Sequence, residues 1–278
     1  MTAYLSRLAD AVYNDVSYAS GGAAALATAA FALQIYCDFG GYSDIARGCS
    51  EMMGVELMVN FKAPYFALSM RDFWKRWHIS LTSWFREYVY FPLGGSRRGF
   101  ARTLRNTLIV FALSGLWHGA SWTVVVWGLL HALYLCAELI WNRLRRNAPK
   151  APGPCCKALL LLKTFVLACI AWTFFRADTM ADALAVLGAA FAGLRHPLTW
   201  MQDAWHLLTA GGTLTAAITV FSVLVLLLGD LLDEKNDAMA AVGRLRPAAR
   251  YALYVVFLLG ILLLIPKTTA APFIYFQF

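Results

Sequence analysis

A histidine lies inside the longest apolar stretch of this chain. Residues 106–135 read NTLIVFALSGLWHGASWTVVVWGLLHALYL, and His118 stands between Trp117 and Gly119. Ionisable groups in such sequence are costly to bury and usually face a protein interior or a wet cavity. Removal from water favours the neutral imidazole, which accepts a proton from a hydroxyl group. His118 is therefore the first candidate for a general base. A histidine that only hydrogen-bonds a neighbouring helix is the alternative.

The other histidines have weaker claims from position alone. His78 lies among tryptophans, where anchoring at the membrane surface is the ordinary role. His131 also lies in apolar sequence, and we expect it to have a structural or supporting role. His196 and His206 have no supporting cluster. The sequence has no HExxH motif and no close set of histidine and acidic residues, so it predicts no metal site.

Two further groups of polar residues carry little catalytic signal. The stretch YCDFGGYSDIARG, residues 36–48, places Asp38 and Asp44 around a Gly40-Gly41 pair, where we expect a helix break and an ordinary polar helix end. The six cysteines form no CxxC pair and are expected to be small core residues. Neither a Gly-x-Ser-x-Gly elbow nor a Walker loop occurs, which argues against a serine hydrolase or an NTPase.

The composition excludes a soluble globular protein. The chain is 60% hydrophobic and only 14% charged, with a mean hydropathy of +0.59, whereas soluble domains have about 25% charged residues. The basic residues behind the net charge of +8 cluster in short loops between apolar segments. That placement is typical of membrane proteins, and no aromatic-basic recognition module accompanies it, so nucleic-acid binding is excluded. We expect no cleavable signal peptide after Met1.

Apolar segments of suitable length predict an all-α, polytopic membrane protein. A helix needs about 20 apolar residues to cross a bilayer. Two shorter stretches, 52–70 and 180–194, are expected to be buried, re-entrant or interfacial. Together the segments predict roughly six to eight membrane elements in a single membrane domain, residues 1–278. The long segments are 21–38, 106–141 (two short passes), 158–175, 213–232 and 251–265.

Basic residues predict the orientation of these segments. Positive flanks on both sides of 106–141 predict that this region enters the membrane from the cytoplasm and returns to it. A second basic loop at 244–250 is also expected in the cytoplasm, which puts 177–212 and the terminal FIYFQF on the outer side. APGP, residues 151–154, is the expected linker.

The stretch 71–91, RDFWKRWHISLTSWFREYVYF, predicts one amphipathic helix in the membrane interface. His78 falls at the seam between its two faces, and FPLGGSRRG then predicts a turn. The aromatic and apolar residues of one face are Trp74, Trp77, Leu81, Trp84, Phe85 and Tyr88.

Three stretches together resemble the membrane-bound O-acyltransferase family, in particular its alginate O-acetyltransferase branch. They are YCDFGGYSDIARG, FWKRWHISLTSWFREYVYFPLGG and GLWHGASWTVVVWGLLHAL, in this order between about residue 30 and residue 140, and FIYFQF resembles the end of that branch. The resemblance implies a helical core that transfers an acyl group from a cytoplasmic donor to a hydroxyl. The family's active histidine, in its WHG block, corresponds to His118, and a second, in its RWHxS block, corresponds to His78.

The resemblance also implies substrates and partners. We expect acetyl-CoA as the donor, no bound cofactor, and an exopolysaccharide such as alginate as the acceptor, reached directly or through a periplasmic acetyltransferase partner in the bacterial inner membrane. Asn106, Trp117 and Trp122 are expected to orient the His118 imidazole or to line an apolar passage that excludes water among membrane lipid. A basic set is expected to attract the donor's phosphates, with a plain positive-inside loop as the alternative. This set is Arg97, Arg98, Arg102 and Arg105.

The chain departs from the family pattern in three respects. Glu87 stands where aspartate is expected, and Ser114 stands where glycine is usual. Family members usually carry several more spans before these blocks, so the chain resembles the C-terminal part of the fold. Three alternatives therefore stay open. They are D-alanyl transfer to teichoic acid from a carrier protein, a transporter in which His118 relays protons, and a non-catalytic membrane fragment.

Overall fold

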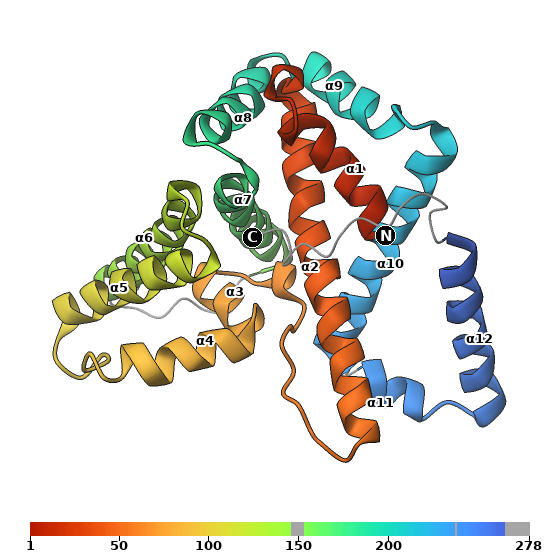
Figure 1. Ribbon diagram of the computed structural model, residues 1–278, viewed down its shortest axis with the longest axis horizontal. Coiled ribbons are helices and arrows are strands. Elements are labelled where there is room, and N and C mark those ends of the chain that lie inside the picture. The colour runs from red at the N-terminus through yellow and green to blue at the C-terminus, as the bar shows by residue number, and fades with distance from the viewer. Residues whose placement is uncertain (146–152, 237, 265–278) are drawn as a thin grey trace.

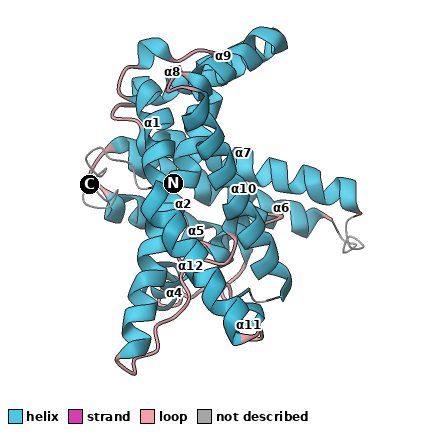
Figure 2. Ribbon diagram, turned by 90° about the vertical axis from the view of Figure 1, so that its right-hand side faces the viewer, coloured by secondary structure: helices cyan, strands magenta, loops and turns pink. Residues whose placement is uncertain are grey.

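The structure is a computed structural model that describes residues 1–145, 153–236 and 238–264. These residues form helices and loops, with no β-strand among them (Figure 2), which confirms the all-α prediction. FIYFQF and residues 151–152 of the predicted linker lie outside the described residues, whereas Pro154 begins a helix.

A long helix, α2 (Gly21–Met52), runs through the centre of the molecule (Figure 1). It packs against α1 (Thr2–Tyr13), which is followed by the short helix η1 (Val16–Tyr18). The predicted break at Gly40-Gly41 is wrong, because α2 continues through both glycines. A glycine in a helix interior lowers the stability of the helix by about 1 kcal/mol relative to alanine. A helix of this length still forms, because each further residue adds a hydrogen bond once the first turn is made.

The predicted helix over 71–91 is in fact three short helices. They are α3 (Met70–Arg76), α4 (Ile79–Phe85) and the π-helix η3 (Arg86–Tyr90). The chain breaks at Trp77, which is extended, and at His78, which is left-handed with φ 44°. Lys62 N donates to Arg76 O and Ile79 N donates to Asn60 O, both at 3.0 Å, so an incoming loop hydrogen-bonds the backbone on both sides of the break. Sequence periodicity carries no sign of that long-range contact.

The loop that makes these contacts replaces the helical element expected at 52–70. Residues 53–69 are irregular apart from η2 (Pro64–Phe66). The apolar face expected for a helix over 71–91 is buried only in part. Trp74, Trp77 and Phe85 are buried, whereas Trp84 and Tyr88 are exposed.

The region 106–141 forms the predicted pair of helices. α5 (Phe100–His118) and α6 (Trp122–Leu144) are joined by a turn at residues 119–121. Two glycines allow them to touch. A Cβ on Gly115 would lie 2.6 Å from Val124 O, and one on Gly128 would lie 2.3 Å from Phe111 O. Residues 115 and 111 therefore pair with 124 and 128 in antiparallel order. His118 ends α5 at this turn, which corrects the expectation that it lies inside a span.

The remaining helices surround α2 and the hairpin. Their bounds are α7 (Pro154–Arg176), α8 (Met180–Ala192), η4 (Gly193–Arg195), α9 (Pro197–Thr209), α10 (Thr213–Asn236), α11 (Ala238–Gly243) and α12 (Pro247–Leu264). Figure 1 shows α9 at one end of α10 and α11 at the other.

Four helices in the described part of the chain are long and apolar enough to cross a membrane. They are α2, α6, α7 and α10, and α12 is a shorter apolar helix. The count is below the predicted six to eight because α5, α8 and α12 do not qualify and 52–70 is not helical. The structure nevertheless supports a multi-pass membrane protein.

Candidate active site

The interior of the molecule contains a continuous cluster of aromatic side chains contributed by distant segments. Trp77 packs against Trp172 of α7 with ring centroids 5.0 Å apart, and Trp172 stacks on Trp127 of α6 at 5.7 Å. All three are buried. This cluster fixes the positions of the short helices and of the hairpin turn, and the candidate site lies beside it.

His78 is held at the break between α3 and α4 by the loop before α3. Its Nδ1 lies 3.3 Å from Asn60 Oδ1, and the same oxygen accepts hydrogen bonds from Ser80 N and Ser80 Oγ. An oxygen that accepts from Nδ1–H leaves the lone pair of the neutral ring on Nε2. Burial lowers the pKa of His78 to about 4, so the ring is neutral near pH 7.

Three rings surround the His78 imidazole, and one of them is Phe61, at 6.4 Å. Phe39, in the middle of α2, meets it edge-on at 4.6 Å, and Trp117 of α5 lies 6.5 Å away. His78 thus joins α2 to the end of α5, although the sequence places these segments far apart.

His118 packs toward the protein interior. Its ring lies 4.8 Å from Trp117, 5.1 Å from Trp127 and 5.4 Å from Phe175 of α7. Trp127 and Phe175 are buried, whereas His118 itself is partly exposed at the turn. His78 and His118 share Trp117 as a neighbour. The structure therefore brings together the two histidines that the sequence singled out.

His131, on α6, packs against the rings that surround the two histidines. Its ring is fully buried, and its Nδ1 accepts a hydrogen bond of 3.2 Å from Trp74 Nε1. It contacts Trp127, one helical turn earlier on α6, at 5.1 Å. Trp127 in turn contacts His118, so one ring separates His131 from His118, and a supporting role for His131 stays a prediction.

The three predicted accessory residues lie in different places. Asn106 is fully buried, but its Nδ2 donates to Leu93 O and Gly95 O, at 3.2 and 3.1 Å. It lies twelve positions before His118 on α5, about 18 Å along the helix axis. Asn106 thus fixes the FPLGG turn and does not contact the imidazole, which corrects the expected orienting role.

The two tryptophans are at the hairpin turn. Trp117 contacts both histidines and is 57% exposed, so it forms an outer wall of the cluster. Trp122 is 77% exposed at the start of α6, where Ser121 Oγ caps the helix by accepting from Val124 N. A role for Trp122 in lining the passage stays a prediction.

The basic set lies at the opposite end of α5 from His118. Arg105 donates to Asn106 Oδ1 at 3.0 Å, and the Arg98 side chain packs over Gly94. Arg97, Arg98 and Arg102 are exposed. Binding of donor phosphates by this set stays a prediction. Among the described residues, no group of three or more histidine, cysteine or acidic side chains lies close enough to hold a metal ion.

Sequence reasoning missed four residues of the site. Asn60 and Phe39 hold and cover His78, while Trp127 and Phe175 pack on His118. Asn60 had a visible signal, since it is an amide within the apolar run ELMVNF. The aromatic residues had none, because they look like any other apolar residue of a membrane helix.

Comparison with known proteins identifies the family of the chain. The family model described as MBOAT, membrane-bound O-acyltransferase family, matches residues 3–177, which is more than half of the chain and includes every residue of the site. The chain belongs to the membrane-bound O-acyltransferase family.

The names of the relatives of this chain describe several related acyl-transfer activities. The probable alginate O-acetylase AlgI of Pseudomonas putida is 35% identical over 269 residues, covering 92% of this chain and 54% of the relative. The peptidoglycan O-acetyltransferase of Helicobacter pylori is 42% identical over 157 residues, 56% of this chain and 29% of the relative. The teichoic acid D-alanyltransferase of Streptococcus thermophilus is 32% identical over 127 residues, which cover 43% of this chain and 31% of the relative. The chain spans about half or less of each relative's length.

Proposed function

We propose that this chain catalyses O-acyl transfer in the bacterial inner membrane. In this proposal an acetyl group passes from cytoplasmic acetyl-CoA to hydroxyls of an exopolysaccharide, or to a periplasmic acetyltransferase that acts as the immediate acceptor. The observation that carries the proposal is the meeting of His78 and His118 at Trp117, because these two histidines come from two separate signature blocks of the family.

His118 acts as the general base in the proposed reaction. The neutral imidazole takes the proton of the acceptor hydroxyl as the oxygen attacks the thioester carbonyl. The new C–O bond forms, the C–S bond breaks, and the imidazolium returns its proton to the departing thiolate. The products are an acetyl ester and a free thiol, so the step needs no further reactant. The aromatic rings around His118 restrict water, which favours transfer to the acceptor over hydrolysis.

His78 is assigned a supporting part in the same step. Asn60 holds its Nδ1–H, so Nε2 is the atom available to a substrate hydroxyl or to His118. A neutral second imidazole beside His118 orients the acceptor without adding a positive charge that would oppose protonation of the base.

The names of the relatives suggest which acyl group is transferred and which acceptor receives it. A relative that matches 92% of the chain is named for alginate acetylation, and the named D-alanyltransferase matches at lower identity over a shorter region. Acetyl transfer to a polysaccharide is therefore the first candidate, and D-alanyl transfer to teichoic acid is the second.

The proposal is tested by the acetyl ester content of surface polysaccharide in cells that depend on this chain. We expect His118→Ala to abolish acetylation at unchanged protein level in the membrane. His196→Ala is the matched control, because His196 lies at the start of α9, away from the cluster, and should leave acetylation intact. Equal acetylation with and without His118 would contradict the proposal, and esters of alanine in place of acetate would favour the second candidate.

A further inference from the structure

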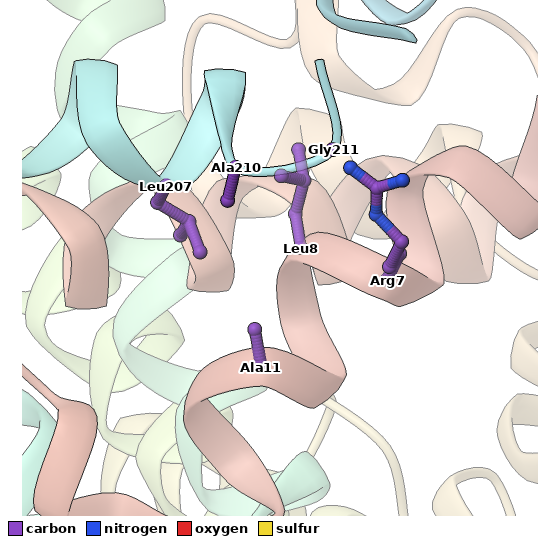
Figure 3. A pocket seen from close by; sticks show the side chains of 6 residues that line it. All are labelled: Arg7, Leu8, Ala11, Leu207, Ala210 and Gly211. Atoms are coloured by element: carbon purple, nitrogen blue, oxygen red, sulfur yellow. The ribbon is translucent and has the colours of Figure 1, made fainter.

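A cavity of about 280 Å³ lies between α1 and the end of α9, outside the histidine cluster. Figure 3 shows that its lining comes from α1 on one side and from the α9–α10 connection on the other. Its volume is near the lower end of the range of ligand pockets, about 300–1,000 Å³. The lining is apolar except for one cation, and consists of Arg7, Leu8, Ala11, Leu207, Ala210 and Gly211.

The position of the cation depends on a glycine. The Arg7 guanidinium lies against the backbone of Gly211, and a Cβ on Gly211 would stand 1.5 Å from Arg7 Nη2. Only glycine therefore allows the guanidinium to rest there. The backbone of Gly211 is not left-handed, so this requirement comes from space and not from backbone conformation.

The positive charge of Arg7 is not used by the described part of the chain. Asp10, on the next turn of α1, pairs with Arg176 at 2.7 Å. Arg7 forms no ion pair with any described residue. An exposed cation at the wall of an apolar cavity is suited to a ligand that has an anionic group and a hydrocarbon part.

The cavity also lies where a membrane surface is expected. Gly211 lies two residues before α10, one of the candidate spans, and the cavity therefore lies at the end of that span. Arginine side chains near the ends of spans extend to the membrane interface, where the guanidinium meets lipid headgroups.

We propose that this cavity binds an anionic phospholipid, with the phosphate on the Arg7 guanidinium and the start of the acyl chains against Leu8, Ala11 and Leu207. The site is separate from the proposed acyl transfer, and it holds whether or not His118 is catalytic. Anchoring a lipid here joins α1 to the α9–α10 connection.

The test measures lipid binding to the purified chain in detergent by native mass spectrometry. The probes are dioleoylphosphatidylglycerol and dioleoylglycerol, which share acyl chains and differ in the phosphate. We expect phosphatidylglycerol to be retained and dioleoylglycerol to be lost. Arg7→Gln should weaken phosphatidylglycerol binding about tenfold or more, as expected for loss of a charged hydrogen bond.

A second variant separates the position of the charge from its presence. Gly211→Ala keeps Arg7 but displaces its guanidinium, so it should weaken binding as Arg7→Gln does. The matched controls are Arg195→Gln, an exposed arginine in η4 that does not line the cavity, and Gly229→Ala, whose Cβ would meet open space. Both should bind lipid as the unmodified chain does, and circular dichroism checks that all four variants remain helical.

Three results would overturn the proposal. The first is unchanged phosphatidylglycerol binding by helical Arg7→Gln or Gly211→Ala. The second is equal retention of dioleoylglycerol, which would show that the phosphate is not recognised. The third is displacement of the lipid by millimolar inorganic phosphate, which would show that the cavity takes a free anion and not a lipid.

Discussion

At the scale of single residues, the structure explains why His78 is part of the site. From its position in the sequence alone, His78 was interpreted as an anchor at the membrane interface. Only the resemblance to the family made it a candidate site residue. The structure places it in a left-handed conformation, hydrogen-bonded to Asn60 and covered by Phe39 and Trp117. A non-glycine residue in this region costs of order 1–3 kcal/mol, and the hydrogen bonds around the break hold it there.

Asn60 is expected to act as a positioning residue for His78. Asn60→Ala removes one of the two oxygens beside His78 Nδ1, leaving Ser80 Oγ at 3.3 Å. The ring is then held less firmly, so kcat should fall roughly tenfold to a hundredfold with little change in the KM for the acyl donor. Asn60→Asp keeps an acceptor oxygen and should recover part of the loss. Steady-state kinetics on membranes containing each variant measures both constants. Ser43→Ala is the control, because it removes only the bond between Asn60 Nδ2 and Ser43 Oγ. A rise in KM alone would contradict the positioning role.

Burial of His78 predicts a pH dependence of stability. Its pKa is about 4 in the folded protein and 6.5 in the unfolded chain, so the unfolded state binds more protons between these values. This contribution is fully present above pH 6.5 and is lost as the pH falls toward 4, by roughly 3 kcal/mol. The melting temperature of the unmodified chain should therefore fall more between pH 7 and pH 4.5 than that of His78→Gln. Parallel curves for the two proteins would contradict this.

At the scale of elements, the α5–α6 hairpin is the part that sequence predicted best. Two apolar passes were expected in 106–141, and two helices with a tight turn are observed. The exact turn was not predicted, so His118 appeared to lie within a span. The loop from 53 to 69 was not predicted either, because its hydrogen bonds to the α3–α4 break join residues that are distant in sequence.

Close packing of the hairpin predicts a strong effect of Gly128→Ala. The added Cβ would lie 2.3 Å from Phe111 O, and a backbone atom cannot move aside without separating the helices. We expect a loss of about 1–3 kcal/mol of stability together with loss of activity, since the separation displaces Trp127 from His118. Thermal unfolding in detergent measures the first effect. Gly188→Ala in α8, whose Cβ would meet open space, is the control. Equal melting temperatures for the two variants would refute the packing argument.

At the scale of the whole molecule, the composition indicated a membrane protein, because so little charged surface cannot coat a soluble fold, and the lengths of the apolar segments predicted helices. The structure adds how the three signature blocks meet. Phe39 comes from the first block, His78 from the second and His118 from the third. Hydrophobic periodicity and segment length can assign each block to a helix. Only the packing of α2, α5 and α7 shows that side chains of the three blocks converge.

The large-scale arrangement is held together partly by polar contacts to α10. Tyr36 Oη donates to Asp230 Oδ1 at 2.8 Å, and Arg76 of α3 pairs with Glu234. Many large apolar residues of α10 nevertheless stay exposed, as expected for a surface solvated by lipid. Among them are Leu214, Val220, Phe221, Leu224 and Leu228.

The predicted orientation of the membrane segments is tested by labelling with a membrane-impermeant maleimide. In a cysteine-free background, Cys155 or Cys156 restored at the exposed start of α7 should react only in inverted vesicles. Cysteine introduced by Arg195→Cys should react only in intact spheroplasts, because basic loops stay in the cytoplasm and 177–212 is expected outside. Labelling of both sites from the same side would contradict this orientation.

The most direct test of the acyl-transfer account is a single-turnover measurement with purified protein, labelled acetyl-CoA and a hydroxyl acceptor. We predict that the unmodified chain transfers label to the acceptor. His118→Ala should bind the donor as before and transfer it about a hundredfold or more slowly, as expected for loss of a general base. Transfer at an unchanged rate by His118→Ala would contradict the account at its centre, because the cluster around His118 would then not be where the acyl group moves.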